Sequence, residues 1–247
     1  MITTGNVSQG VSNPPDARLY HMVHRVLLNC NNQRLLRLLL GIAFTLENFY
    51  VNRLRPRLGF RYSEKYLAYS WILNNPLVSP GMRVLDIGCG DSLFPSKLAS
   101  LGYQSYAVDI SDAGCIAAKD SRVNFTKSDV CDMPFQSNTF DVLIAISALE
   151  HVEEGKMGLA VKEISRVLRK DGIIFVTMPD CDDKELGHSA TMSRLLTRDF
   201  KVLRHEHRVL TSKKAAKGSS DPASAVLQGG AGVTFLLLST LPRQELK

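Results

Sequence analysis

The sequence predicts an α/β fold in which helices flank a seven-stranded, mostly parallel sheet, with a helical extension at the N-terminus. Three patterns lead to this class. From residue 82 onward, short runs rich in Val and Ile alternate with segments of helical period, which is typical of strand–helix–strand units. Before residue 75 the apolar residues recur mainly at helical spacing. Near the C-terminus, two apolar runs joined by a Gly- and Ser-rich segment indicate a long hairpin.

The N-terminal part divides into a polar tail and a helical region. Residues 1–17 are rich in Gly, Ser and Asn and contain a Pro-Pro pair, so we expect them to be disordered. Residues 18–75 carry apolar residues three and four apart, including a helical stretch at Glu64–Leu73, and are expected to form a helical extension or lid. The turn signals between Asn74 and Gly81 end this region. We therefore place the main domain at 76–247.

The main domain begins with five expected strands. Each is short, apolar and suited to burial in a parallel sheet: Met82–Ile87, Ser105–Ile110, Val123–Lys127, Phe140–Ile146 and Gly172–Met178. Helical segments are expected between them at Pro95–Leu101, Ala113–Lys119 and Gly158–Leu168. The terminal hairpin pairs Phe200–Leu210 with Val233–Leu241 across the loop Ser212–Gly232.

Charge, cysteine content and hydropathy indicate where the basic residues lie, whether a metal site is expected and in which compartment the protein works. The net charge is +6 and the pI is about 9.1, but residues 1–65 hold nine basic and three acidic residues, leaving 21 of each for 66–247. The positive excess belongs to the N-terminal quarter alone. The five scattered cysteines have no zinc-ligand spacing, so no metal site is predicted. No stretch resembles a signal peptide or a membrane span, and we expect a cytoplasmic protein, with peripheral membrane contact through the basic helices as an option.

Chemistry-bearing residues follow the first two strands. Gly88 and Gly90 stand where the first strand turns into a helix, which lets backbone N–H groups approach a ligand. Asp109 ends the second strand, nineteen residues after Gly90. A carboxylate at that position can accept both hydroxyls of a ribose, or it can cap the next helix; the upstream glycine turn favours ligand binding. Leu93 replaces the third glycine of a dinucleotide fingerprint.

The segment from Asp86 to Ser92 resembles the first motif, [DE]xGxGxG, of the class I S-adenosylmethionine-dependent methyltransferases of type 11, with Ser92 in place of the last glycine. Ser128–Phe135, Phe140–Val152 and Glu163–Gly172 resemble later segments of that family, so the likeness covers about residues 82–180. It implies a Rossmann-like sheet of strand order 3-2-1-4-5-7-6 with strand seven antiparallel, and S-adenosylmethionine as the cofactor.

The resemblance also assigns candidate site residues. It places Asp129 against the adenine amino group, with Asp132 as the alternative. The cofactor-binding set is Asp86, Gly88, Cys89, Gly90, Asp109, Ile110, Asp129, Val130 and Ser147. Glu150 and His151 follow the fourth strand at the edge where ligands bind in such sheets. His151 is a candidate general base, with Glu150 beside it, if the acceptor is a hydroxyl; otherwise His151 packs beneath the cofactor.

Several functions stay open from the sequence. The leading prediction is methyl transfer to a small-molecule, glycan or lipid acceptor. A nucleic-acid (RNA) methyltransferase using the basic N-terminal segment is an alternative, although residues 145–148 lack the [DN]PP[FY] signature. A non-catalytic S-adenosylmethionine-binding protein is another. Four arginines and four tyrosines near the end of the N-terminal segment allow two interpretations: a basic lid over the site, or a solvated helix face whose aromatic side chains pack on the core. These residues are Arg53, Arg55, Arg57, Arg61, Tyr50, Tyr62, Tyr66 and Tyr69.

Overall fold

The computed structural model describes residues 30, 32, 35, 36, 38, 39, 42, 63–113, 115–180, 188–209 and 232–240. The expected disordered tail, most of the expected extension and the hairpin loop 212–231 lie outside these residues, as do Arg53, Arg55, Arg57, Arg61, Tyr50 and Tyr62. The described elements are α3 (Ser63–Asn74), β1 (Arg83–Ile87), α4 (Phe94–Ser100), β2 (Gln104–Asp109), η1 (Ala117–Lys119), β3 (Asn124–Lys127), β4 (Phe140–Ile146), η2 (Leu149–His151), η3 (Glu154–Lys156), α5 (Met157–Val167), β5 (Leu168–Asp180), α6 (Ser189–Asp199), β6 (Lys201–Val209) and β7 (Gly232–Ser239).

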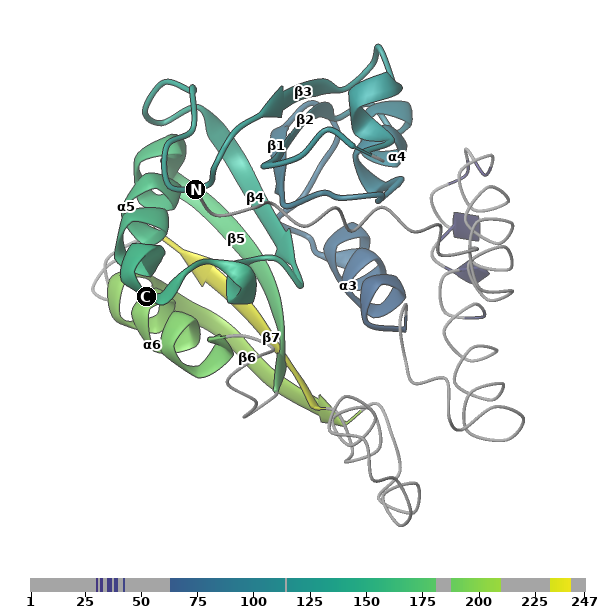
Figure 1. Ribbon diagram of the computed structural model, residues 1–247. Helices are drawn as coiled ribbons and strands as arrows, with labels where there is room; N and C mark the ends of the chain where they lie inside the picture. Colours follow the sequence, from purple (N-terminus) through teal and green to yellow (C-terminus); the bar gives the residue numbers. More distant parts are fainter. Residues whose placement is uncertain are drawn as a thin grey trace, which may run out of the picture.

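One seven-stranded sheet forms the centre of the described protein (Figure 1), in the order β3-β2-β1-β4-β5-β7-β6. The pairs from β3 to β5 are parallel, whereas β7 runs antiparallel to both β5 and β6. The predicted fold class and strand order are confirmed. Because β1 and β4 are neighbours while the chain goes from β1 to β2, the strand order reverses at β1, and in such sheets ligands bind outside the carboxyl ends of the strands at that point.

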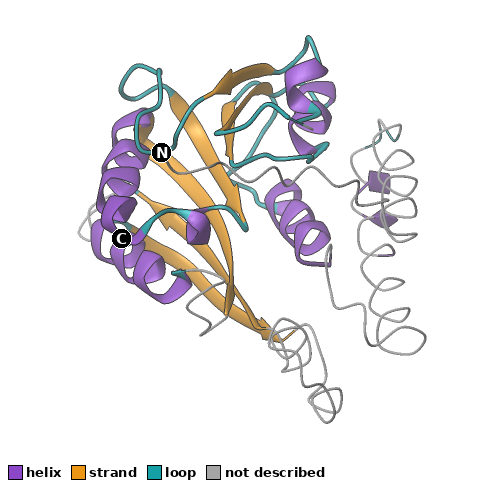
Figure 2. Cartoon of the chain, viewed as in Figure 1, coloured by secondary structure: helices purple, strands orange, loops and turns teal. Residues whose placement is uncertain are grey.

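Helices cover both faces of the sheet (Figure 2). On one face, α3 and α4 share a buried apolar cluster with β1, β4, β5 and β7, to which α3 contributes the fully buried Ile72 and Leu73. On the other face, α5 and α6 pack against β4, β5 and β7. In α5 the buried residues recur three and four apart, as an amphipathic helix on a sheet requires: Met157, Ala160, Val161, Ile164 and Val167.

Three elements differ from the sequence prediction. The helix expected at Ala113–Lys119 shrinks to η1, because side chains satisfy the preceding backbone: the Ala113 N–H donates to Ser111 Oγ and the Cys115 thiol to the Ser111 carbonyl. Helix α6 was not predicted. Strand β5 starts early, at Leu168, and its register against β4 shifts, so that residues 169–172, at the junction of the expected helix and the expected strand, form an irregular bulge.

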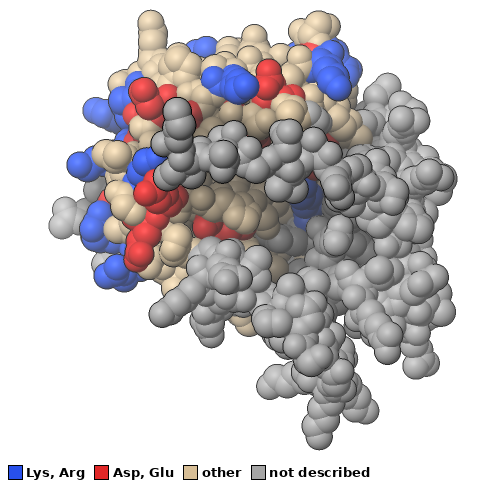
Figure 3. All heavy atoms as spheres, viewed as in Figure 1, with Lys and Arg blue, Asp and Glu red and all other residues tan. Residues whose placement is uncertain are grey.

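Surface charge agrees with a neutral sheet domain. In Figure 3, acidic and basic side chains of the described residues lie interspersed over the visible face. No described helix is long and apolar enough to cross a bilayer.

Candidate active site

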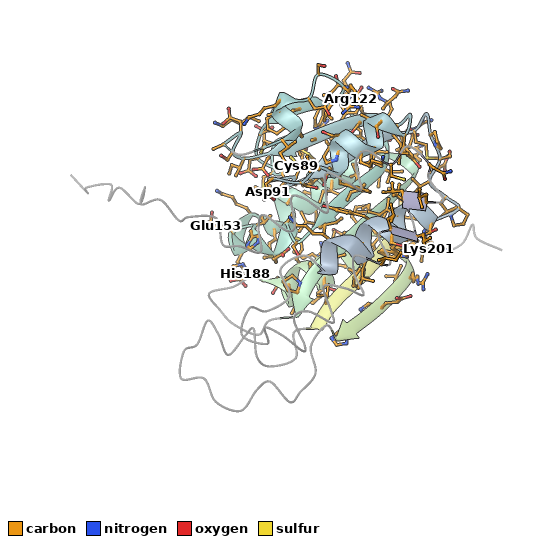
Figure 4. The ribbon with its side chains drawn as sticks, turned by 90° about the vertical axis from the view of Figure 1, so that its right-hand side faces the viewer. Cys89, Asp91, Arg122, Glu153, His188 and Lys201 are labelled. Atoms are coloured by element: carbon orange, nitrogen blue, oxygen red, sulfur yellow. The ribbon has the colours of Figure 1, made fainter. Side chains whose placement is uncertain are left out.

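The predicted site residues come together at the carboxyl edge of the parallel strands. Asp86 lies near the end of β1, Asp109 ends β2, and Ser147 directly follows β4. Figure 4 shows Cys89 and Asp91, in the loop after β1, toward the same edge of the sheet as His188. Lys201, at the start of β6, lies toward the opposite edge. The topology therefore gathers residues that are more than sixty positions apart in the sequence.

The two glycines after β1 have different structural roles. Both have left-handed backbones, with φ of +67° at Gly88 and +49° at Gly90. A Cβ added at Gly88 would lie 2.5 Å from the Ala148 Cβ, so Gly88 allows the loops after β1 and β4 to pack together. A Cβ added at Gly90 would meet no atom within 4 Å. Gly90 is therefore the glycine that leaves open space beside the backbone, where a ligand can approach.

Asp109 is tied to the glycine loop. Its Oδ2 accepts the Gly90 N–H at 2.8 Å, and its Oδ1 accepts the Ser111 N–H at 3.0 Å. Each carboxylate oxygen has two lone pairs, so one acceptor position remains on each for a ligand hydroxyl. The next residue, Ile110, is 72% exposed. A half-buried carboxylate beside an exposed apolar side chain suits a ribose and the face of an attached base.

A buried carboxyl lies beneath the glycine loop. Asp86 is 4% exposed, and burial raises its pKa to about 7; the Lys65 ammonium opposes this rise and the Asp109 carboxylate adds to it. Lys65 also lies 3.6 Å from Asp91. A cation from α3 therefore balances a group of carboxylates around the loop.

Helix α3 also supports the loop through Tyr69. The Tyr69 and Ser92 hydroxyl oxygens are 2.7 Å apart and hydrogen-bonded, and the Tyr69 ring stacks on Phe94 at 4.0 Å between centroids. Ser92 Oγ also accepts the Phe94 N–H. Ser92 thus receives an N–H of the first residue of α4, and the N-cap residue itself is Leu93. Tyr69 is 3% exposed, so it packs in the core.

The loop after β3 is held from α5. Asp129 Oδ1 accepts the Cys131 N–H at 2.9 Å, so this carboxylate shapes the turn, and its remaining lone pairs can accept further donors. Both Asp129 and Val130 are half-buried, whereas Asp132 is exposed. Arg166 donates to the Met133 carbonyl at 2.9 Å and to the Phe135 carbonyl. This anchor was missed by the sequence reasoning, and the only signal was the Glu163–Arg166 spacing on a helix.

In the loop after β4, one of the two candidate catalytic residues is buried and the other is exposed. Ser147 has a left-handed backbone with φ of +48°, a strained state for a non-glycine residue that is concentrated at functional sites. Glu150 is 1% exposed, whereas the His151 side chain is 68% exposed, with Nε2 3.9 Å from Glu150 Oε1. His151 thus stands at the surface of the predicted edge. The His188 N–H donates to the Glu150 carbonyl and ties this loop to α6.

Two thiols lie under Asp109. The Cys89 and Cys115 sulfurs and an Asp109 oxygen all lie within 4.8 Å of one another, and both cysteines are buried. Burial is the main cause that raises the pKa of each thiol, and nearby carboxylates add to it. Cys30 and Cys131, in contrast, are half-buried. This cluster could not be predicted from the sequence, because Cys89 and Cys115 lie on different loops.

A sheet of this order with a glycine loop and a strand-end acid at its carboxyl edge defines the class I S-adenosylmethionine-dependent methyltransferase fold. Residues 85–176 match the family described as a methyltransferase domain. The chain is 27% identical over 161 residues to a ubiquinone biosynthesis O-methyltransferase of Mesorhizobium japonicum, covering 63% of this chain and 64% of that protein. It is 34% identical over 147 residues to a sterol 24-C-methyltransferase of Schizosaccharomyces pombe, covering 53% and 36%. The chain spans less than two thirds of either relative.

Solved structures share the fold at lower identity. The [4+2]-cyclase SpnF gives a TM-score of 0.57 at 20% identity, covering 72% of this chain and 82% of the other. The 1,6-didemethyltoxoflavin-N1-methyltransferase of Burkholderia thailandensis, solved with 1,6-didemethyltoxoflavin and S-adenosylhomocysteine, gives 0.53 at 16% identity, covering 71% and 77%. These likenesses establish the architecture.

Proposed function

We propose that the protein is an S-adenosylmethionine-dependent methyltransferase that acts on a small-molecule or lipid acceptor. The observation that carries this proposal is the geometry at the end of β2: the Asp109 carboxylate held by the Gly90 N–H, with Ile110 72% exposed beside it. Open space at Gly90 adds to the fit, because a side chain there would occupy the position of a ligand. The residues present therefore suit a nucleoside with a free ribose diol.

Each part of the edge has a place in the proposed site. Asp109 would accept the ribose hydroxyls through its remaining lone pairs, and Ile110 would cover the adenine face. Asp129 would receive the adenine amino group through the remaining lone pairs of its carboxylate. The strained Ser147 and the loop that follows it would border the reacting end. S-adenosylmethionine supplies a methyl group already activated on a positively charged sulfur.

The protein's task in such a reaction is alignment. Holding a nucleophile in line with a reactive bond can lower the barrier by about 7–11 kcal/mol. The rigid core under the site suits this task, because Gly88 and Ala148 lock the loops after β1 and β4 together. An acceptor whose nucleophile is already a carboxylate, a thiolate or a neutral amine needs little further help, whereas a hydroxyl needs a base.

His151 is the proposed base for a hydroxyl acceptor. Its exposed imidazole stands at the same edge as Ser147 and can reach a bound acceptor from solvent, while Glu150 lies beneath it. The relatives named as ubiquinone biosynthesis O-methyltransferases support an oxygen acceptor of this kind, whereas the sterol 24-C-methyltransferases support an apolar acceptor methylated at carbon. Their shared feature, an apolar small molecule, is the acceptor class that we propose.

The neutral sheet domain argues against a nucleic-acid acceptor at this edge. Basic and acidic residues balance over 66–247, and binding a phosphate backbone requires a cluster of cations. The basic segment before residue 63 lies almost wholly outside the described residues, so its role as lid or membrane contact stays a prediction, as does a cytoplasmic location.

A labelled-methyl assay tests the proposal. The protein is incubated with methyl-labelled S-adenosylmethionine and fractionated cell extract, and the labelled product is identified by mass. We expect label in an organic-soluble small molecule, and none with Asp109→Ala. Label in RNA would support the alternative acceptor, and S-adenosylmethionine binding without any labelled product would support the non-catalytic alternative.

A further inference from the structure

A buried cluster of two thiols and a carboxylate lies at the floor of the proposed site. Cys89 follows Gly88 in the glycine loop, Asp109 ends β2, and Cys115 lies in the turns that precede η1. Their sulfur and oxygen atoms fall within 4.8 Å of one another. Among the residues that the structure describes, this is the one group of three such side chains close enough to share a metal ion.

We propose that Cys89, Asp109 and Cys115 form a site for a thiophilic divalent cation of the zinc class, and that this cation and the cofactor exclude each other. The geometry is close to what such an ion needs. Two thiolates on a tetrahedral zinc ion lie about 3.8 Å apart, because each zinc–sulfur bond is about 2.3 Å long. The cluster therefore has to close by about 1 Å or less, and the fourth position stays free for water.

The surroundings of the two sulfurs favour a cation over a redox pair. Carboxylates flank the cluster: Asp86 and Asp109 act on Cys89, and Asp91, Asp109 and Asp112 act on Cys115. This negative potential disfavours a free thiolate, which is the species that attacks a disulfide or a peroxide. A divalent cation reverses the balance, because its charge offsets the carboxylates and each thiol that becomes a ligand releases its proton to solvent.

The loop that carries Cys115 can adjust to an ion. Residues 111–113, 115 and 116 are not helical, although the sequence predicted a helix from Ala113, and the Cys115 thiol donates to the Ser111 carbonyl at 2.9 Å. When that proton leaves, the sulfur can turn toward Cys89 without breaking a helix. Cys89 itself is held in place because the Gly88 and Cys89 N–H groups both donate to the Val108 carbonyl.

Exclusion of the cofactor follows from the lone pairs of Asp109. Two of its four acceptor positions already receive the Gly90 and Ser111 N–H groups. A ribose diol needs the remaining two, and a metal ion takes at least one of them. This part of the inference rests on the proposed function, whereas cation binding by the cluster does not.

Cadmium is the probe, because cadmium–thiolate bonds absorb in the ultraviolet. The tag-free protein is titrated with Cd²⁺, following absorbance, heat and proton release. We expect one ion per chain and about two protons released. Cys115→Ser keeps a donor for the Ser111 carbonyl but removes a thiolate, and should weaken binding at least about tenfold. Cys131→Ser is the matched control, since Cys131 is a half-buried thiol that donates to the Lys156 carbonyl; it should bind Cd²⁺ like the wild type.

Competition is measured with S-adenosylhomocysteine, without Cd²⁺ and with Cd²⁺ at a concentration that fills the wild-type site but not the weakened site of Cys115→Ser. We expect its affinity to fall at least about tenfold in the wild type and to stay unchanged in Cys115→Ser. The metal site would be overturned, with the proposed function left intact, if S-adenosylhomocysteine binds normally and no cadmium–thiolate absorbance appears. An equal loss of Cd²⁺ affinity in Cys115→Ser and Cys131→Ser would overturn it as well. Cadmium binding without any S-adenosylhomocysteine binding would instead overturn the proposed function. Simultaneous binding at full affinity would refute the exclusion.

Discussion

The buried carboxyl of Asp86 makes the stability of the fold depend on pH in an unusual direction. Burial raises its pKa to about 7 from an ordinary value of 3.8. The folded protein therefore holds this proton more tightly than the unfolded chain does. The stabilising contribution is complete below about pH 4 and is lost as the pH rises toward about 7. Most surface carboxylates that gain a cationic partner act in the opposite direction.

The size of the effect follows from the shift. Between about pH 5 and about pH 8, a carboxyl with this folded pKa loses about 3 kcal/mol of its contribution to the free energy of unfolding, on the scale of 1.36 kcal/mol per pKa unit. Asp86→Asn keeps the size of the side chain but cannot ionise. Relative to the wild type, the variant should therefore gain about 3 kcal/mol of stability when the pH is raised from 5 to 8.

Urea unfolding of both proteins at the two pH values measures this difference, and taking the difference of differences cancels every other titrating group. Asp120→Asn is the control. The Arg122 guanidinium lowers the pKa of Asp120, so this carboxylate is ionised in both states throughout the interval and the variant should run parallel to the wild type. Parallel behaviour of Asp86→Asn as well would refute the reasoning.

Three further expectations can be checked with single variants. Gly88→Ala should lower the free energy of unfolding in urea by about 3 kcal/mol, because the new Cβ meets Ala148 at a left-handed backbone. Gly90→Ala should lower it by only about 1 kcal/mol, yet weaken the binding of S-adenosylhomocysteine at least about tenfold. Equal stability losses in the two variants would contradict this. Arg166→Met should cost about 1–2 kcal/mol through its lost bonds to the loop after β3, and a wild-type unfolding midpoint would show that the anchor is dispensable. His151→Ala should leave stability and S-adenosylhomocysteine affinity unchanged but slow transfer to a hydroxyl acceptor about 100-fold or more, so a wild-type rate on such an acceptor would remove it as a base.

The strands were predictable because they are buried on both faces. Strand β4 was bounded correctly at Phe140–Ile146, since an apolar run of that length between turns suits little else. Helix α6 was missed although its buried residues recur at helical spacing, at Ser189, Met192 and Leu196, because polar residues dominate it. The helix expected at Ala113–Lys119 failed for a different reason: Ser and Asp side chains offered the backbone other partners.

Only the part of the site that follows from the strand topology could be predicted from the sequence. The sequence order of strands, together with the rule that ligands bind at their carboxyl ends, is enough to bring the glycine loop to Asp109. Loop packing is different, because it depends on the path of each loop through space. Neither the contact of Gly88 with Ala148 nor that of Cys89 with Cys115 leaves a pattern in the sequence, and both emerge from the fold.

The central claim is that Asp109 binds the ribose of S-adenosylmethionine. Calorimetric titration with S-adenosylhomocysteine, comparing the wild type with Asp109→Asn, tests it most directly. Asparagine can still accept one backbone N–H, so the loop can remain folded, and Asp112→Asn controls for charge because Asp112 is exposed and paired with Lys127. We expect wild-type and Asp112→Asn affinities to agree and Asp109→Asn to bind about 100-fold more weakly. Equal affinity in all three proteins, or no binding by the wild type, would contradict the account.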